Sequence, residues 1–534
     1  MRRALRYVVL VLALAVLAGA AYRTLRGGAV TIEEWTPMGR PPRIRPDYTS
    51  TVVPPNIAPL NFCVDEDGDR YCVKVRSSSG DPIEVVGTTG QIVIPPGRWR
   101  KLLDANRGEE LHFDVYVQAP DGRWSRFDTI TNSIAAEEID RYMVYRRINV
   151  MYDEYVRMGI HQYDLENAED ILVLDNRSFD GGCMNCHTFW NNSTEKMLLH
   201  VRSGQKDYGM GMLLVQDGVV EKVDARTEFS PRPAAFSSWH PSGRVVAFST
   251  NKVRQFFHHA RTEIRDGTDL DSDMGIYLLD SKTVASTAAI CRPDRLETWP
   301  AWSADGAHLY FCSSPVPWSD RDTVPPEHYE QVRYDLVRIG YDVNTGTWGE
   351  AETVLSSEDT GLSITLPRAS PDGRFLVFCM SEYSTFPTFQ PSSDLYLMDL
   401  AGREYRRMEC NSDRAESWHS WSSNSRWLAF SSKRGDGLFI RAYFSYVDEN
   451  GTAHKPFVLP QSDPVFYDSF IKLYQMPEMV RELVPVRGEE IAGVIRSAPW
   501  TRSGPPVTAP TPRAASEPVP PSAEGPEAWT PHVQ

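Results

Sequence analysis

The feature that most constrains the fold is a segment that recurs four times in the second half of the chain. Each copy has an aromatic or small residue, a polar turn, and then an alternating apolar strand. The copies are SSWHPSGRVVAFST (237–250), PAWSADGAHLYFCSS (300–314), PRASPDGRFLVFCMS (367–381) and HSWSSNSRWLAFSSK (419–433). Their anchors, 63, 67 and 52 residues apart, are Trp239, Trp302, Ala369 and Trp421. The sequence therefore predicts a fold of repeated units.

Further strands with their own turns lie between the anchors. Examples are MGIYLLDSKT (274–283), YDLVRIGYDVNTGTW (334–348) and SDLYLMDLAGRE (393–404). A repeat with several short strands per unit indicates the blades of a β-propeller. One blade cannot bury both of its faces, whereas a ring of blades can. We expect five or six blades over residues 206–462, with the hairpin 208–223 as a shorter unit.

The chain before the repeats divides into three parts. Residues 27–60 are rich in proline and predict an extended linker that docks on the next domain. Residues 61–133 alternate strands and turns, which indicates a small β-sandwich. Residues 134–205 begin with apolar residues at helical spacings (Ile139, Met143, Ile148), so we expect a helical connector followed by a cysteine-containing segment. The expected fold class is mainly β.

The two ends of the chain have distinctive compositions. Residues 1–26 combine Arg2 and Arg3 with an apolar run over 7–21, which is the order of a secretory signal. Arg23 and Arg26 follow the run directly, so the sequence leaves open a cleaved signal or an uncleaved inner-membrane anchor. At the other end, residues 463–497 predict a helical segment, and 498–534 a disordered Pro-rich tail.

The net charge limits the class of partner. The whole chain carries -15, and residues 1–26 hold five Arg and no acid, so the remainder stands at -20. Nucleic-acid binding requires a basic face, which argues against that class. With an export signal, the sequence predicts a periplasmic or otherwise exported protein.

The sequence Cys183-Met184-Asn185-Cys186-His187 is a C-x-x-C-H motif. Two thiols at this spacing can add to the two vinyl groups of one haem, and the adjacent histidine can bind the iron as the proximal ligand. A zinc site would need a second ligand pair, and the chain has no other C-x-x-C. A thioredoxin-like pair would need a βαβ setting, and a Cys183–Cys186 disulfide would leave His187 unexplained. The motif therefore predicts one covalent haem c.

The distal iron ligand stays open at this stage. His200 lies thirteen residues after His187 and is the first candidate. The weaker candidates are Met197, His258 and His259. A second histidine favours a low reduction potential, a methionine raises it, and an open position permits substrate chemistry.

Six further cysteines lie outside the motif. In an oxidising compartment an even number favours disulfides. Cys63 and Cys72 flank the acidic turn 65–70, so a hairpin there predicts a Cys63–Cys72 disulfide. Pairings of Cys291 with Cys312 and of Cys379 with Cys410 follow only from proximity in the chain, and buried free thiols are the alternative.

The repeat core, as in Trp239-His240-Pro241-Ser242-Gly243, resembles TolB-type (WD40-like) propeller repeats. Together with GGCMNCHTFWNNSTEKMLLHVRSG (181–204), it resembles exported TolB-like propeller cytochromes and, more distantly, the large haem-bearing subunit of hydrazine synthase. The resemblance implies a propeller with one c-type haem held by Cys183 and Cys186. In the hydrazine synthase subunit a tyrosine shortly after the motif binds the iron. Asn191 and Asn192 stand in that stretch here, which argues against hydrazine-forming chemistry.

Three functions remain as expectations. The first is an exported monohaem cytochrome that transfers electrons, or docks in a redox-dependent way, in an envelope complex. Its redox partner protein would have a basic docking surface, which complements the acidic chain. The alternatives are a haem-dependent oxidoreductase with an open iron site, and a TolB-like interaction module with a structural haem.

Overall fold

A computed structural model describes residues 31–504, apart from 151–155, 203, 205, 228–229, 262 and 321–322. The signal or anchor predicted for residues 1–26, and the part of the predicted tail after 504, lie outside this range. Of the helices in the described ranges, none combines the length and the apolar character needed to cross a membrane. The chain divides into two compact units, and each is described by itself.

The first unit comprises residues up to 138 together with 165–168 and 455–470. Its larger sheet has seven strands: β1 (Thr36–Pro37), β3 (Val52–Val53), β5 (Arg70–Arg76), β6 (Ile83–Gly87), β8 (Glu110–Gln118), β9 (Trp124–Arg126) and β10 (Ile130–Ile134). A smaller sheet holds β2 (Ile44–Arg45), β4 (Phe62–Val64) and β7 (Gln91–Ile92). The unit also contains α2 (Pro96–Asp104), β33 (Phe457–Val458) and α4 (Phe466–Ser469). Two sheets were expected from the sequence, and the helix α2 was not.

Aromatic side chains join the layers of this unit. The rings of Phe62 and Phe113, one from each sheet, lie 6.0 Å apart, and Trp99 of α2 lies 6.3 Å from Phe113. Trp99 is buried, and its indole N–H donates to the Ile57 carbonyl oxygen at 2.9 Å. Because residues 36–53 supply β1, β2 and β3, the described part of the predicted linker packs into this unit as strands.

The predicted Cys63–Cys72 disulfide is wrong in this structure. Cys63 lies in β4 and Cys72 in β5, and these strands belong to different sheets, so the expected hairpin does not form. All eight cysteines of the chain are free thiols. Cys72 instead packs against Tyr116 and Trp124 in a buried cluster. The acidic turn 65–70 redirects the chain from one sheet to the other.

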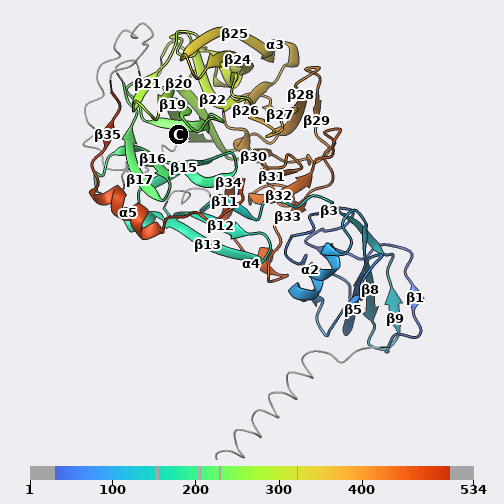
Figure 1. Ribbon diagram of the computed structural model, residues 1–534. Helices are drawn as coiled ribbons and strands as arrows, with labels where there is room; N and C mark the ends of the chain where they lie inside the picture. The colour runs from blue at the N-terminus through green and yellow to red at the C-terminus, as the bar shows by residue number, and fades with distance from the viewer. Residues whose placement is uncertain are drawn as a thin grey trace, which may run out of the picture. The chain divides into compact units, whose positions relative to one another are not determined.

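The second unit contains six antiparallel sheets that follow one another along the chain (Figure 1). Blade 1 consists of β34 (Leu473–Val480), β11 (Tyr142–Ile148), β12 (Met158–Asp164) and β13 (Glu169–Asp175). Blade 2 consists of β14 (Cys183–Trp190), β15 (Ser193–Arg202), β16 (Met210–Gln216) and β17 (Val219–Asp224). Blade 3 consists of β18 (Ala234–Trp239), β19 (Val245–Phe257), β20 (Arg265–Leu278) and β21 (Thr283–Ala285).

The last three blades carry the remaining repeats. Blade 4 consists of β22 (Arg295–Trp302), β23 (His308–Pro315), β24 (Asp335–Asp342) and β25 (Thr347–Leu355). Blade 5 consists of β26 (Ser363–Ala369), β27 (Phe375–Ser381), β28 (Asp394–Asp399) and β29 (Tyr405–Arg407). Blade 6 contains β30 (Glu416–Trp421), β31 (Trp427–Ser432) and β32 (Arg441–Tyr446). Short helical turns accompany them: α3 (Ser357–Thr360), η3 (Tyr329–Gln331) and η4 (Pro387–Phe389).

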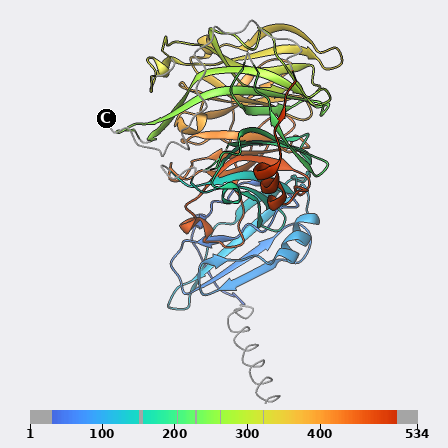
Figure 2. The ribbon, with the colours of Figure 1, turned by 90° about the vertical axis from the view of Figure 1, so that its left-hand side faces the viewer.

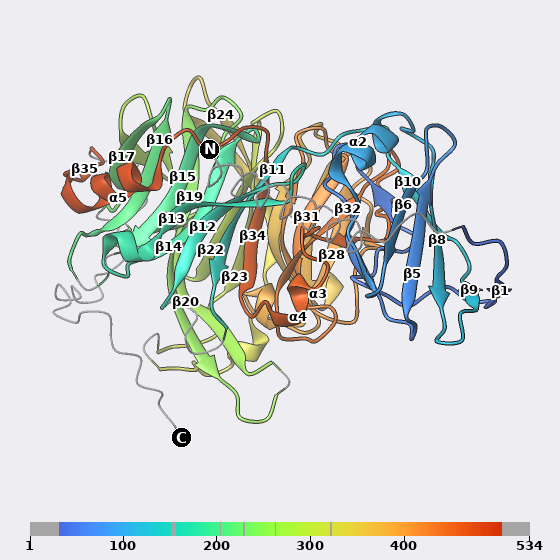
Figure 3. The same cartoon turned by 90° about the horizontal axis from the view of Figure 1, so that it is seen from below.

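The first strand of each blade contacts the first strand of the next, and β30 and β14 both contact β34. The six innermost strands β34, β14, β18, β22, β26 and β30 therefore form a closed ring, and the unit is a six-bladed propeller. The ring closes in blade 1, where β34, from near the end of the chain, pairs with β11 (Figure 3). The repeat anchors Trp239, Trp302, Ala369 and Trp421 each end an innermost strand.

One sequence expectation about this unit is wrong and another is only partly right. Residues 134–168, predicted as a helical connector, hold the strands β11 and β12. The predicted helical segment 463–497 is helical in α4 and in α5 (Gly488–Ser497), but between them it forms the strand β34. Met143, Val144 and Tyr145 are fully buried, so β11 is apolar on both faces and lacks the alternation that marks a half-exposed strand. The propeller thus extends beyond the predicted 206–462 and includes the C-x-x-C-H segment.

The end of the described chain lies along blades 1 and 2. The helix α5 contacts β13, β17 and the short η2 helix (Asn176–Phe179) (Figure 2, in which α5 faces the viewer). The strand β35 (Thr501–Arg502) then pairs with β17 in parallel. Trp500 donates its indole N–H to the Tyr208 carbonyl oxygen at 2.8 Å, and Lys222 lies 4.6 Å from its ring. We refer to residues 488–502 as the C-terminal strap.

Candidate functional site

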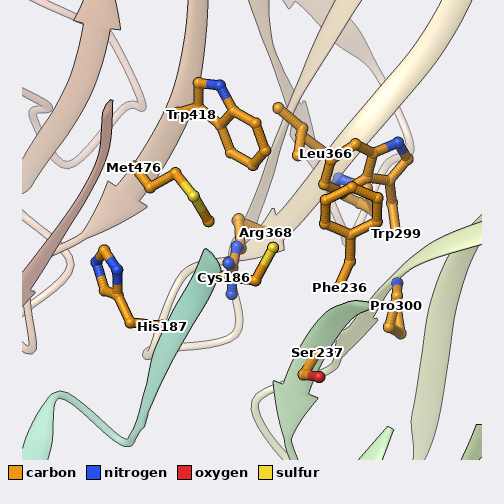
Figure 4. A pocket seen from close by; sticks show the side chains of 11 residues that line it. Cys186, His187, Phe236, Ser237, Trp299, Pro300, Leu366, Arg368, Trp418 and Met476 are labelled. Atoms are coloured by element: carbon orange, nitrogen blue, oxygen red, sulfur yellow. The ribbon is translucent and has the colours of Figure 1, made fainter. Parts of the chain in front are cut away.

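A small cavity of about 30 Å³ lies on the propeller axis and receives at least one residue from every innermost strand (Figure 4). A cavity of this size has room for about one or two water molecules. The lining residues are Cys186, His187, Phe236, Ser237, Trp299, Pro300, Leu366, Pro367, Arg368, Trp418 and Met476. We call it the axial cavity.

A β-bulge in each blade shapes this cavity, at the same place in five blades and one residue earlier in blade 3. The ladder between the first and second strands gains one residue on the innermost strand in all six blades. A bulge bends its strand and redirects side chains. Five bulge residues have the left-handed backbone conformation uncommon outside glycine: Cys186 (φ 51°), Trp299 (φ 56°), Leu366 (φ 54°), Trp418 (φ 47°) and Met476 (φ 55°). The C-x-x-C-H motif therefore places Cys186 at the bulge of blade 2.

The two motif cysteines have different surroundings. Cys186 lines the axial cavity, and burial raises the pKa of its thiol to about 12. Cys183 begins β14, is half-buried, and packs against the apolar cluster between blades 1 and 2. Asn185 Nδ2 lies 3.5 Å from its sulfur. The structure thus brings one cysteine to the cavity and leaves the other outside its lining.

His187 is held as a neutral imidazole. It is 2% exposed, and burial lowers its pKa from 6.5 to about 4. Its Nε2 lies 3.3 Å from the Val144 carbonyl oxygen of blade 1, and since a carbonyl only accepts, Nε2 carries the proton. Nδ1 is then an unprotonated acceptor, and it is buried without a hydrogen-bond partner. A bare ring nitrogen on a histidine whose other nitrogen donates to a carbonyl is the arrangement of a metal ligand.

The sequence candidates for a distal ligand lie outside the cavity lining. His200 is buried in β15, burial lowers its pKa to about 3, and its Nε2 lies 2.9 Å from Ser237 Oγ, which does line the cavity. Met197 is buried in the cluster between blades 1 and 2. His258 follows β19, and its Nε2 lies 3.0 Å from the Asp266 carboxylate. His259 is next to it in the chain and is not a lining residue either.

Sequence reasoning missed the other cavity residues. Figure 4 shows Met476 beside His187, and Phe236 against Trp299, with ring centroids 3.5 Å apart. A signal was available, because Met476-Pro477 aligns with Trp299-Pro300 and Leu366-Pro367 in the repeat. This alignment is hard to recognise because the rest of the repeat is missing around residue 476.

The cavity residues supply donors for one end of a haem, but the cavity of about 30 Å³ does not itself hold a porphyrin. Cys186 can form a thioether, His187 offers a bare nitrogen, and the aromatic rings provide apolar walls. Cys183 would have to reach the same group from the start of β14. Among the described residues, no group of three or more His, Cys, Asp or Glu side chains is arranged to hold a metal ion by itself. The donor set therefore suits a metal carried by an organic group better than a protein-only metal centre.

Comparison with known proteins gives no family. No family model and no curated protein matches the chain. An oligogalacturonate lyase from Vibrio parahaemolyticus is 13% identical over 72% of this chain and 100% of its own, with a TM-score of 0.32. A chain of a nidogen–laminin complex is 6% identical over 64% and 100% (TM-score 0.36), and Porphyromonas gingivalis dipeptidyl peptidase 4 is 15% identical over 58% and 46% (TM-score 0.30). Similarity of this degree carries no argument about fold or function. The assignment of a propeller therefore rests on the strand pairing described above.

Proposed function

We propose that this chain is an exported c-type cytochrome with one haem attached at the C-x-x-C-H motif of its propeller. The observation that carries the proposal is His187, a neutral histidine in a C-x-x-C-H motif whose buried Nδ1 has no hydrogen-bond partner. Cys186 and Cys183 would attach the haem, and His187 would bind the iron. Bound there, haem supplies one-electron redox chemistry.

The chain's own residues would set the properties of this site. The carbonyl oxygen of Val144 fixes the tautomer and ring orientation of His187. Phe236, Trp299 and Trp418 keep water from one side of the cavity. An apolar surrounding of this kind raises the cost of extra charge on the iron and so raises its reduction potential.

The proposed role is electron transfer, or redox-dependent docking, in the cell envelope. The basic and then apolar order of residues 1–26 supports export, with the segment either cleaved or kept as an inner-membrane anchor. The charge of -20 on the remainder supports a redox partner with a basic docking surface and argues against nucleic acid.

Mass measurement of the full-length protein from a host that attaches haem tests the proposal. We expect the chain mass plus one haem, less the signal if it is cleaved. Cys186→Ala abolishes this gain, whereas Cys291→Ala, a buried cysteine outside the motif, retains it. The same cells should attach haem to another c-type cytochrome as a control. If they do and the wild-type chain gains no mass, covalent haem is ruled out.

A further inference from the structure

The second and third strands of blade 3 extend well beyond the rest of the blade. β19 and β20 have 13 and 14 residues, whereas the second and third strands of the other five blades have 6 to 10. The pairing of β19 with β20 shifts register after Asn251 and then continues to the pair Phe257 and Arg265 (Figure 3). A bulge of this kind bends a hairpin away from its sheet. We call residues 252–261 and 263–267 the blade-3 arm.

The blade-3 arm reaches the opposite side of the ring. In a ring of six blades, blade 6 lies opposite blade 3, yet Glu263 of the arm forms an ion pair with Lys433, which directly follows β31 of blade 6. Asp266 of the arm accepts hydrogen bonds from the Tyr383 hydroxyl at 2.8 Å and from the Gln390 amide at 3.3 Å. These two residues belong to the loop between β27 and β28 of blade 5. The arm therefore crosses one end of the propeller axis.

A ring from this blade 5 loop lies between the arm and the axial cavity. The centroid of the Phe386 ring is 6.4 Å from that of Phe236 and 6.3 Å from that of Trp299, and both of these residues line the cavity. A Cβ added at Gly267 of the arm would lie 3.1 Å from the Phe386 ring, so the arm backbone packs against that ring. Movement of the arm would thus uncover the layer that covers the cavity.

The arm is held by buried charges. The side chains of Glu263, Lys433 and Arg265 are 10%, 5% and 3% exposed, and Arg265 pairs with Glu263 at 3.0 Å. Burial would raise the pKa of Glu263, but the two cations outweigh burial, lower this pKa and keep the carboxylate ionised. Desolvation of buried charges costs free energy, and this cost is recovered when the charges return to water. Such a contact therefore opens more easily than an apolar contact of the same area.

We propose that the blade-3 arm is a gate over one end of the axial cavity and that the Glu263–Lys433 ion pair holds it closed. In the closed state Cys186 is 8% exposed, and the cavity has room for about one or two water molecules. Opening separates the arm from Phe386 and gives access to the cavity while the blades stay folded. The gate acts in the chain without haem and does not depend on the proposed function.

Thiol labelling of the full-length protein, produced without attached haem, tests the gate. N-ethylmaleimide under native conditions, followed by peptide mass spectrometry, gives separate labelling rates for Cys186 and for Cys291. Cys291 is also 8% exposed but lies outside the cavity lining. Lys433→Met leaves Glu263 buried with one cation fewer and should raise the rate at Cys186 by about tenfold or more, with the rate at Cys291 unchanged. Adding Glu263→Gln removes the poorly compensated charge and should return the Cys186 rate toward that of the wild type.

Hydrogen exchange of the same variants locates the movement. In Lys433→Met the backbone amides of the blade-3 arm should exchange faster than in the wild type, while those of β16 keep their protection. Tyr383→Phe is a milder second variant. It removes the hydroxyl that donates to Asp266 and should raise the Cys186 labelling rate by a smaller factor than Lys433→Met does.

The matched control is Arg244→Gln. Arg244 forms an exposed ion pair with Asp280 at the opposite end of β19 and β20, and the variant should label like the wild type. Unchanged labelling of Cys186 in both Lys433→Met and Tyr383→Phe, with native circular dichroism, overturns the proposal. Equal acceleration at Cys186 and Cys291 also overturns it, because the whole unit then opens rather than the arm alone.

Discussion

His187 and His419 occupy the same position in blades 2 and 6, and each donates its Nε2–H to a backbone carbonyl of the preceding blade. The acceptors are Val144 at 3.3 Å and Val377 at 3.1 Å, which lie at matching places in the second strands β11 and β27. The two histidines differ at the other nitrogen. Nδ1 of His419 faces Cys379 Sγ at 3.8 Å, whereas Nδ1 of His187 has no partner and His187 lines the axial cavity. In both blades the histidine at this position joins its blade to the preceding one. Only in blade 2 does its Nδ1 remain free to bind a ligand.

This pair gives a matched comparison of stability and haem binding. His187→Ala and His419→Ala should each lower the free energy of unfolding by about 2–3 kcal/mol, because each removes a buried ring and its hydrogen bond. Only His187→Ala should also change the visible spectrum of the haem-loaded protein. Urea unfolding and absorption spectra measure the two effects. A spectrum that is the same in both variants would show that His187 only joins blades.

The buried histidines predict a loss of stability in acid. Burial lowers the pKa of His187 to about 4 and those of His200 and His419 to about 3, against 6.5 in the unfolded chain. Unfolding therefore takes up protons between pH 6.5 and about 4, so stability falls as the pH is lowered through this window. Each histidine contributes at most about 1.4 kcal/mol per pH unit.

Urea unfolding at several pH values isolates one of these contributions. His419→Gln removes one titrating group outside the cavity lining and should flatten the acid limb relative to the wild type. An acid limb of equal steepness in the variant would mean that His419 already titrates normally in the folded protein.

The distal ligand can be tested by comparing two variants. Met476 lines the axial cavity, while His200 lies behind Ser237, to which its Nε2 is bonded. We therefore expect Met476→Leu to convert a six-coordinate haem to a five-coordinate one that binds carbon monoxide, and His200→Ala to leave the spin state unchanged. A changed spin state in His200→Ala alone would restore the histidine predicted from the sequence. If the wild type itself binds carbon monoxide readily, the enzyme hypothesis gains over electron transfer.

The C-terminal strap should stabilise blade 2. Trp500 fills the space above Gly209 and Gly211, where an added Cβ would lie 2.5 Å from its ring. Trp500→Ala should lower the free energy of unfolding by about 1–3 kcal/mol, because it removes a partly buried ring, a hydrogen bond and the Lys222 contact. Val219→Ala, at an exposed residue of β17 in the same blade, is the control and should stay within about 0.5 kcal/mol of the wild type. If the two variants unfold with equal free energies, the C-terminal strap does not stabilise blade 2.

The repeat allowed four blades to be predicted, since Trp239, Trp302 and Trp421 each mark the end of an innermost strand and Ala369 fits the same pattern. Of the two remaining blades, blade 2 was recognised only by its outer hairpin 208–223, which forms β16 and β17, and blade 1 was not recognised. In blade 1, the strand β34 pairs with β11 across more than 320 residues, and no local pattern encodes such a partner. In blade 2, Phe189 stands where blades 3, 4 and 6 have tryptophan, so the innermost strand of blade 2 lacks the aromatic anchor of the repeat.

The sequence alone determined that the chain contains propeller repeats, a C-x-x-C-H motif and a net negative charge, because these depend on residue types and short spacings. Only the tertiary structure decided that the motif is an innermost strand, that Cys63 and Cys72 belong to different sheets, and that Arg368 and Met476 join Cys186 on the axis. The physical reason is that each blade contributes one or a few residues to the cavity. Residues from strands as far apart as β14 and β34 become neighbours only when the ring closes and buries the strand edges.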